Sequence, residues 1–179
     1  MSRKKVVPLI LLLSLLSIFF FLIPLNEAFT FTESRSEHMW TYYIPLEQDN
    51  VFQLRYTHSI HLTDVLETYE VIADHKIQLR SMQYEDLAIG LPGYAEEGES
   101  LTVKDGVYTL TYDYNVIDSF VLLIGDVDAD LAFRYLGKEL DLKKHLERGK
   151  SYTFRVSKIS YFQMLKGVNI NGARKKEER

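Results

Sequence analysis

The 179-residue chain contains no cysteine. Disulfide bonds, thiolate metal sites and cysteine nucleophiles are therefore excluded, and so is a lipid-modified N-terminal cysteine. Any chemistry must come from histidine, carboxylate, hydroxyl, lysine or arginine side chains. The length allows one domain of ordinary size together with a short additional segment.

Several sequence signatures are missing as well. The chain has no nucleophile elbow, no phosphate-binding loop and no dinucleotide-binding fingerprint, and no cofactor is predicted. Basic residues are in deficit, because the segment after residue 5 carries all 25 aspartates and glutamates but only 18 of the 21 lysines and arginines. Such an acidic body argues against nucleic acid as a partner.

The N-terminus carries a long apolar run. Three basic residues at positions 3–5 precede the uncharged stretch Val6–Leu25, whose 20 residues can cover a hydrocarbon core of about 30 Å as a helix. Asn26 and Glu27 do not provide a good signal-peptidase site. The pattern predicts an uncleaved transmembrane anchor; a cleaved signal that releases a secreted body, or a segment buried in the protein, are the alternatives.

Positive charge before the apolar run predicts the orientation. Basic residues next to a membrane segment stay in the cytoplasm, so the sequence predicts a single-pass cell-membrane protein with a cytoplasmic N-terminus and an extracytoplasmic body. The polar residues after the anchor show no apolar period and predict an irregular stalk. The folded domain is expected to start near Met39. The predicted segments are a cytoplasmic basic start (1–5), the anchor (6–25), the stalk (26–37), an extracytoplasmic β domain (38–160) and a charged tail (161–179).

Apolar and polar residues alternate with period two through most of the chain after the stalk. This pattern is typical of strands with one buried face. The alternating apolar positions are Trp40 and Tyr42; Phe52, Leu54 and Tyr56; Ile77 and Leu79; Leu131, Phe133 and Tyr135; and Tyr152, Phe154 and Val156.

Turn residues favour the same fold class. Asp105-Gly106 lies between two β-rich runs, which predicts a tight hairpin. Phe120–Ile124 is a continuous apolar run of strand length, and only Leu140–Arg148 has helical spacing, with Gly149 placed to end the helix. About eight short strands and one short helix predict an all-β body, a single β-sandwich-like domain preceded by the N-terminal transmembrane helix.

The densest group of functional side chains lies in the polar stretch Thr57–Asp64, between two predicted strands of a hairpin. The stretch contains Thr57, His58, Ser59, His61, Thr63 and Asp64, and Arg55 and Glu67 lie just outside it. A turn centred near His61 would place Arg55 across from Glu67. We therefore expect an ion pair between these two residues on one face of the hairpin.

His58, His61 and Glu67 also suggest a metal site, since imidazoles and a carboxylate are good zinc ligands. A catalytic zinc needs three converging ligands and an open position, and a His-x-x-His pair on a turn does not by itself provide them. We expect the body to be metal-free, with His58 either hydrogen-bonded at the rim of the core or part of a functional site. The acidic run at residues 126–130 is interpreted as a turn, because the glycine and glutamate of a calcium loop are missing.

A second stretch, residues 84–99, combines acidic residues with glycines and contains no base. Gly90 and Pro92 shape its backbone, and Glu96 and Glu97 follow them. Loops of this length are functional more often than short connections are. A solvated acidic loop without a function is the alternative.

Together the two stretches resemble a bacterial family catalogued as domain of unknown function 1850. The resemblance rests on Tyr56-Thr57-His58-Ser59-Ile60 and on Gly90-Leu91-Pro92 followed by acids, and it covers residues 53–99. Two positions depart from the family pattern: Ala88 stands where a glycine is expected, and Leu91 replaces a methionine.

The resemblance implies a partner, because members of this family look like neighbours of TAXI-type TRAP transporters. An accessory role beside the membrane or solute-receptor components of such an uptake system is the expectation that follows. The residues that carry a binding or structural motif would be Arg55, Thr57, His58, Ser59, Glu67, Gly90, Pro92, Glu96 and Glu97.

Two functions remain as hypotheses. The first is a non-enzymatic accessory or binding domain, in which Arg55, His58 and Glu67 brace the acidic loop or contact a transporter component. The second is a metal-dependent or hydrolytic enzyme built on His58, His61 and Glu67. The sequence itself is compatible with the first, because an anchored, acidic body without cysteine suits a binding or assembly role.

Overall fold

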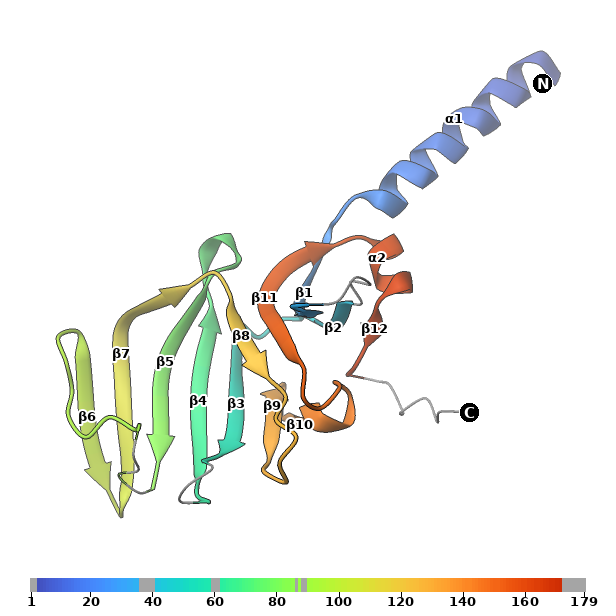
Figure 1. The fold of residues 1–179 in the computed structure, drawn as a ribbon. Coiled ribbons are helices and arrows are strands. Elements are labelled where there is room, and N and C mark those ends of the chain that lie inside the picture. The colour runs from blue at the N-terminus through green and yellow to red at the C-terminus, as the bar shows by residue number, and fades with distance from the viewer. Residues whose placement is uncertain (1–2, 36–40, 59–61, 86, 88–89, 172–179) are drawn as a thin grey trace.

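Figure 1 shows the computed structural model of the chain, which describes residues 3–35, 41–58, 62–85, 87 and 90–171. Helix α1 (Arg3–Leu22) comes first and extends away from a body made of β-strands. Within the described residues, no helix combines the length and the apolar character needed to cross a membrane.

The chain is mostly strand, as predicted. The strands are β1 (Asn26–Glu33), β2 (Thr41–Pro45), β3 (Val51–Thr57), β4 (Asp64–Val71), β5 (Ile77–Tyr84), β6 (Glu99–Lys104), β7 (Val107–Ile117), β8 (Phe120–Leu123), β9 (Leu131–Tyr135), β10 (Lys138–Asp141), β11 (Ser151–Ile159) and β12 (Val168–Asn169). Two 3₁₀ turns, η1 (Ala73–His75) and η2 (Leu142–Lys144), and helix α2 (Tyr161–Lys166) complete the described elements.

The strands form two sheets. The large sheet has the order β10-β9-β3-β4-β5-β7-β6, and the small sheet has the order β12-β2-β1-β11-β8. The chain passes from the large to the small sheet between β7 and β8. In Figure 1 the small sheet lies beside β3, β9 and β10, whereas β5, β7 and β6 extend away from it.

Aromatic side chains fill the space between the two sheets. The ring of Phe29, on β1, lies 5.0 Å from that of Phe52 and 5.1 Å from that of Phe133, both on the large sheet. Phe154, on β11, contacts the same group of rings and is fully buried. Because buried aromatic rings contribute large apolar areas, this cluster is the main source of stability holding the sheets together.

Strand β1 corrects the expectation of an irregular stalk over residues 26–37. It is the central strand of the small sheet, paired with β2 on one side and β11 on the other. Phe29 and Phe31 point into the core, where both are fully buried, and they alternate with Thr30 and Thr32. The short alternation is a strand signal, and burial of the two rings explains why the segment is ordered.

The helix expected over Leu140–Arg148 is also wrong. Residues 138–141 form β10, and only Leu142–Lys144 makes a 3₁₀ turn. Leu142 and Leu146, whose helical spacing prompted the prediction, are both buried in the core, so a single turn satisfies their packing. The backbone N–H of Gly149 then donates to the Ile124 carbonyl and returns the chain to the small sheet.

The start of the predicted charged tail is folded. Ser160 accepts a hydrogen bond from the N–H of Gln163 and caps α2, while the Gln163 side chain accepts from the N–H of Ser160. Strand β12 then pairs in parallel with β2, and Ile170 is fully buried. The small sheet therefore includes residues beyond the predicted domain boundary at 160.

The predicted hairpin at Asp105-Gly106 is confirmed. These two residues connect β6 to β7, with Lys104 directly opposite Val107. Their φ angles are 53° and 83°, and two positive values are what a tight type I′ hairpin turn requires.

Candidate functional site

Glu67 lies on β4 and faces the space between the two sheets. The register pairs Glu67 with Leu54 and Arg55 with Leu66. Because directly opposite residues of neighbouring strands share a face, Glu67 shares the apolar face with Leu54 and Arg55 lies on the other face. The expected Arg55–Glu67 ion pair is therefore wrong. The observed register buries the apolar residues of both strands on one side, which the assumed register cannot do.

Two tyrosine hydroxyls hold the Glu67 carboxylate. Tyr56 donates a hydrogen bond to Oε1 at 3.1 Å, and Tyr69 donates one to Oε2 at 2.6 Å. The ring of Tyr69 is stacked on those of Phe52 and Phe120, with centroid distances of 5.1 and 5.6 Å. Since Tyr69 is fixed by this packing, the carboxylate is held in one orientation in advance of any ligand.

The tyrosines near Glu67 remain protonated. Burial raises the pKa of Tyr56 and of Tyr69, and the negative charge of Glu67 raises both further. Burial, followed by the charges of Glu99 and Glu67, raises the pKa of Tyr112 to about 12. At neutral pH these phenols act as hydrogen-bond donors and not as general bases.

A cavity of about 370 Å³ opens beside Glu67, and we call it the Glu67 pocket. Its size lies within the range of pockets that hold small molecules. It lies where the chain crosses from the large to the small sheet. The lining residues are Leu54 and Tyr56 from β3, Glu67 and Tyr69 from β4, Leu79 from β5, Asn115 and Ile117 from β7, Phe120, Val121 and Leu122 from β8, and Leu131 from β9.

The pocket combines an apolar wall with a single charged group. Among the described residues that line it, Glu67 is the only carboxylate, and there is no lysine, arginine or histidine. Nor does the described part of the chain contain a group of three or more histidines and carboxylates placed to hold a metal ion. This arrangement can orient a small ligand by one carboxylate, and it offers no set of metal ligands.

Arg55 organises a separate ionic cluster on the opposite face of the large sheet. Its guanidinium lies 3.1 Å from Asp64, 3.1 Å from Asp130 and 2.8 Å from Glu139, and Glu139 also pairs with Arg134 at 2.5 Å. These hydrogen bonds lower the pKa of Glu139. The Arg55 side chain is 15% exposed, so the cluster ties three segments of the chain to β3.

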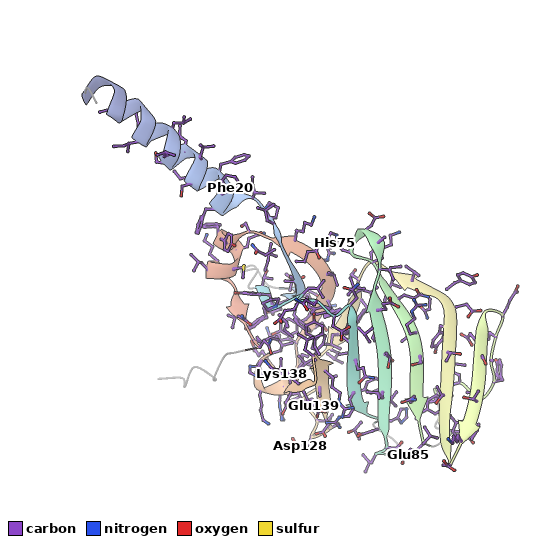
Figure 2. All side chains as sticks on the ribbon, turned by 180° about the vertical axis from the view of Figure 1, so that it is seen from behind. Phe20, His75, Glu85, Asp128, Lys138 and Glu139 are labelled. Atoms are coloured by element: carbon purple, nitrogen blue, oxygen red, sulfur yellow. The ribbon has the colours of Figure 1, made fainter. Side chains whose placement is uncertain are left out.

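Figure 2 shows where this cluster lies in the molecule. Of the labelled residues, Glu139 belongs to the cluster, and it lies in the part of the body away from α1, on which Phe20 is labelled. Because the ion pairs of the Arg55 cluster join β4, the β8–β9 connection and β10 to β3, they favour a structural role for Arg55.

Only part of the predicted polar loop is described. His58 follows β3; its N–H donates to the Thr63 carbonyl at 2.8 Å, and its carbonyl accepts from Leu62 N–H at 2.9 Å. Thr57 donates to Asp64 at 3.3 Å and so joins the two ends of the loop. Ser59 and His61 lie outside the described residues, and a site that includes them remains a prediction.

The acidic stretch forms the connection between β5 and β6. The Tyr84 hydroxyl donates to the Pro92 carbonyl, which fastens the loop to the face of the sheet. Gly90 has a φ angle of 93°, a conformation that favours glycine. Glu96 and Glu97 are exposed, and the three carboxylates that pair with Arg55 come from other segments. The sequence-based idea that Arg55 braces this loop is not supported.

Of the sequence-predicted site residues that the structure describes, Glu67 alone lines the pocket. Its main polar partner, Tyr69, and the residues from β7 and β8 were missed. One signal could have found them: along β4, Glu67 is in phase with Val65, Tyr69 and Val71, all of which are buried. A glutamate in the apolar phase of a strand indicates a carboxylate that faces the core.

A protein-family model matches the part of the chain that contains the pocket. The model of the family described as Domain of unknown function (DUF1850) matches residues 52–142, just over half of the chain. Neither the curated proteins nor the solved structures include one with significant similarity. The matched span contains the large sheet apart from Val51, every residue that lines the Glu67 pocket and the whole Arg55 cluster.

Proposed function

The chain belongs to the DUF1850 family, and we propose that it is a membrane-anchored, extracytoplasmic binding domain that takes up a small ligand in the Glu67 pocket. The pocket is the observation that carries the proposal. It joins an apolar wall to one fixed carboxylate, and its residues all lie in the span that the family shares. Convergent polar groups in an apolar cavity are the usual features of a binding site.

The proposal includes a partner system. The resemblance over residues 53–99 implies an accessory role beside a TAXI-type TRAP transporter, and a binding domain outside the membrane would suit its membrane or solute-receptor components. The acidic body and the solvent-exposed loop with Glu96 and Glu97 support contact with a protein partner more than with a nucleic acid.

Anchoring by the N-terminal segment is supported by its sequence and by its surface. The stretch Val6–Leu25 carries no charge and follows three basic residues. The side chains of Ile10, Leu15 and Phe19 are 59%, 64% and 59% exposed, so they pack little against the protein. Exposed apolar side chains in such a row gain stability when a lipid phase covers them.

Orientation can be tested with protease. When a protease is added to intact protoplasts, the body should be digested while α1 stays with the membrane. Survival of the body until the cells are lysed would overturn the extracytoplasmic assignment. Release of an intact body into the medium would instead indicate a cleaved signal.

Function can be tested with two matched variants of β8. Val121 and Leu123 are 65% and 62% exposed, but only Val121 lines the pocket. We expect Val121→Trp, which puts a bulky ring at the exposed rim of the pocket, to hinder ligand entry and reduce uptake of the solute in cells that depend on the chain, and Leu123→Trp to leave uptake unchanged. Equal activity of both variants would contradict the proposed site.

Association is tested separately. The full chain, extracted from its own membranes in mild detergent, should co-purify with TRAP transporter components. Recovery of the chain without them would reject that partner, while the test of the pocket would stand on its own.

A further inference from the structure

The charge inside the Glu67 pocket is unbalanced. Glu67 carries the one negative charge of the lining, and the described lining residues include no base to neutralise it. The nearest polar partners are the hydroxyls of Tyr56 and Tyr69, which donate hydrogen bonds but carry no positive charge. A partly buried carboxylate without a cation is costly, and a positively charged ligand would remove that cost.

The hydrogen-bond capacity of Glu67 leaves room for such a ligand. A carboxylate offers about four acceptor positions, and the two tyrosines take one on each oxygen. Each oxygen therefore keeps one position for another donor. An ammonium group provides three N–H donors on a compact cation, which fits the remaining acceptors.

The aliphatic part of the pocket wall determines which chemical group the other end of the ligand carries. Leu54, Leu79, Ile117, Leu122 and Leu131 surround the carboxylate with aliphatic side chains. A strongly hydrated ion would lose its water here without replacement, and a divalent metal ion would find too few oxygen ligands. An apolar group fits this wall.

We propose that the Glu67 pocket selects small organic cations, with an ammonium group bound by Glu67 and an apolar body packed on the aliphatic wall. This inference rests on the proposed binding function and adds the chemical class of its ligand. Anionic molecules are excluded from the site by the same charge. The pocket thereby sorts molecules of similar size by the sign of their charge.

Three probes of nearly the same shape test the inference: benzylamine, benzyl alcohol and benzoate. Binding to the full chain in mild detergent is followed by calorimetry at neutral pH. We expect benzylamine to bind about tenfold more tightly than benzyl alcohol, and benzoate to show no saturable binding. Comparable binding of benzyl alcohol or benzoate would overturn the inference, and so would the absence of binding by all three.

Two variants that each remove one negative charge test whether the preference for benzylamine depends on Glu67. Glu67→Gln keeps an oxygen that can accept from the tyrosines but removes the charge, and it should abolish the preference for benzylamine over benzyl alcohol. Glu70→Gln, on the same strand but paired with Arg80 on the other face, is the control and should keep the preference. An unchanged preference in Glu67→Gln would overturn the inference.

A second pair of variants does not depend on altering the buried carboxylate. Val121 lies at the exposed rim of the pocket, so folding should tolerate a charged side chain there. Val121→Glu should strengthen benzylamine binding and Val121→Lys should weaken it, whereas the same changes at Leu123 should have little effect. Steric effects alone would shift both Val121 variants in the same direction, and that result would overturn the inference.

These outcomes separate the inference from the proposed function. Equal binding of benzylamine and benzyl alcohol, both blocked by Val121→Trp, would leave the pocket as a binding site and reject only its preference for cations. Normal solute uptake by the Val121→Trp variant would reject the proposed function, whatever the probes show.

Discussion

Arg55 shows how one side chain can stabilise several segments at once. Its guanidinium binds carboxylates from β4, from the β8–β9 connection and from β10. Charge-assisted hydrogen bonds of this kind contribute more than neutral ones, but the carboxylates are 41–68% exposed, so water screens part of the attraction. The cluster is therefore a moderate stabiliser of the fold.

A double-mutant cycle measures this contribution. We expect Arg55→Met to lower the free energy of unfolding by about 1.5–3 kcal/mol, since three charged acceptors lose their donor. The cycle with Glu139→Gln should show a coupling energy of about 0.5–1 kcal/mol, as expected for residues in direct contact. The cycle with Glu67→Gln should show none, because the two side chains lie on opposite faces. Denaturant unfolding provides the values, and a large Arg55–Glu67 coupling would contradict the register.

The raised pKa of Tyr112 predicts instability in alkali. In the unfolded chain a tyrosine loses its proton near pH 10, whereas folded Tyr112 keeps it until about pH 12. Between these values the unfolded state binds fewer protons, so the free energy of unfolding falls as pH rises. Tyr112→Phe should reduce this loss. Tyr114→Phe, whose tyrosine is 86% exposed on the same strand, is the control. Equal alkaline profiles of the native chain and Tyr112→Phe would contradict the prediction.

At the scale of elements, β1 decides whether the small sheet exists. It contributes the central strand, and its Phe29 contacts both sheets. Strand β8, in contrast, is a short edge strand whose Val121 and Leu123 are exposed. The centre of the small sheet is thus a strand from the N-terminal part of the chain, and the pocket lies at the edge of this sheet, beside β8.

Truncating Phe29 tests the role of β1. Phe29→Ala removes a ring that is fully buried, and we expect a loss of about 3–5 kcal/mol in the free energy of unfolding. Leu25→Ala, just before the strand and 56% exposed, should change it little. Thermal or denaturant unfolding of the full-length variants provides both values. A negligible effect of Phe29→Ala would instead agree with an irregular stalk.

At the scale of the whole molecule, the family span and the folded unit are different. Residues 52–142 contain the large sheet and β8, but β1, β2, β11 and β12 lie outside this span. The apolar face of the large sheet is covered by Phe29, Phe31 and Phe154 from these outer strands. A segment that matches a family model is not for that reason an independent folding unit.

This arrangement predicts the behaviour of two fragments. Residues 52–142 alone should expose the core rings, bind an apolar dye and unfold without a cooperative transition. Residues 26–171, which hold both sheets, should unfold cooperatively. Circular dichroism with dye binding compares them, and cooperative unfolding of the shorter fragment would show that the large sheet is stable without the small one.

Much of the local structure could be predicted from the sequence. The period-two alternation located the strands, and the Asp105-Gly106 pair located a hairpin. The first hairpin was also placed correctly, as β3 and β4 with the polar loop between them. These features depend on neighbouring residues, so local propensity and turn geometry are sufficient to specify them.

What the sequence determined by itself is therefore the mostly β class, several turns and the absence of thiol chemistry. Tertiary structure alone decided that Arg55 and Glu67 face opposite sides, that residues 26–33 form a central strand and that six strands converge on one pocket. The physical reason is that alternation repeats every two residues and so does not specify which residues of two strands are paired. The pairing is chosen by burial of apolar side chains from distant parts of the chain, such as Phe29 and Phe154, which no local pattern records.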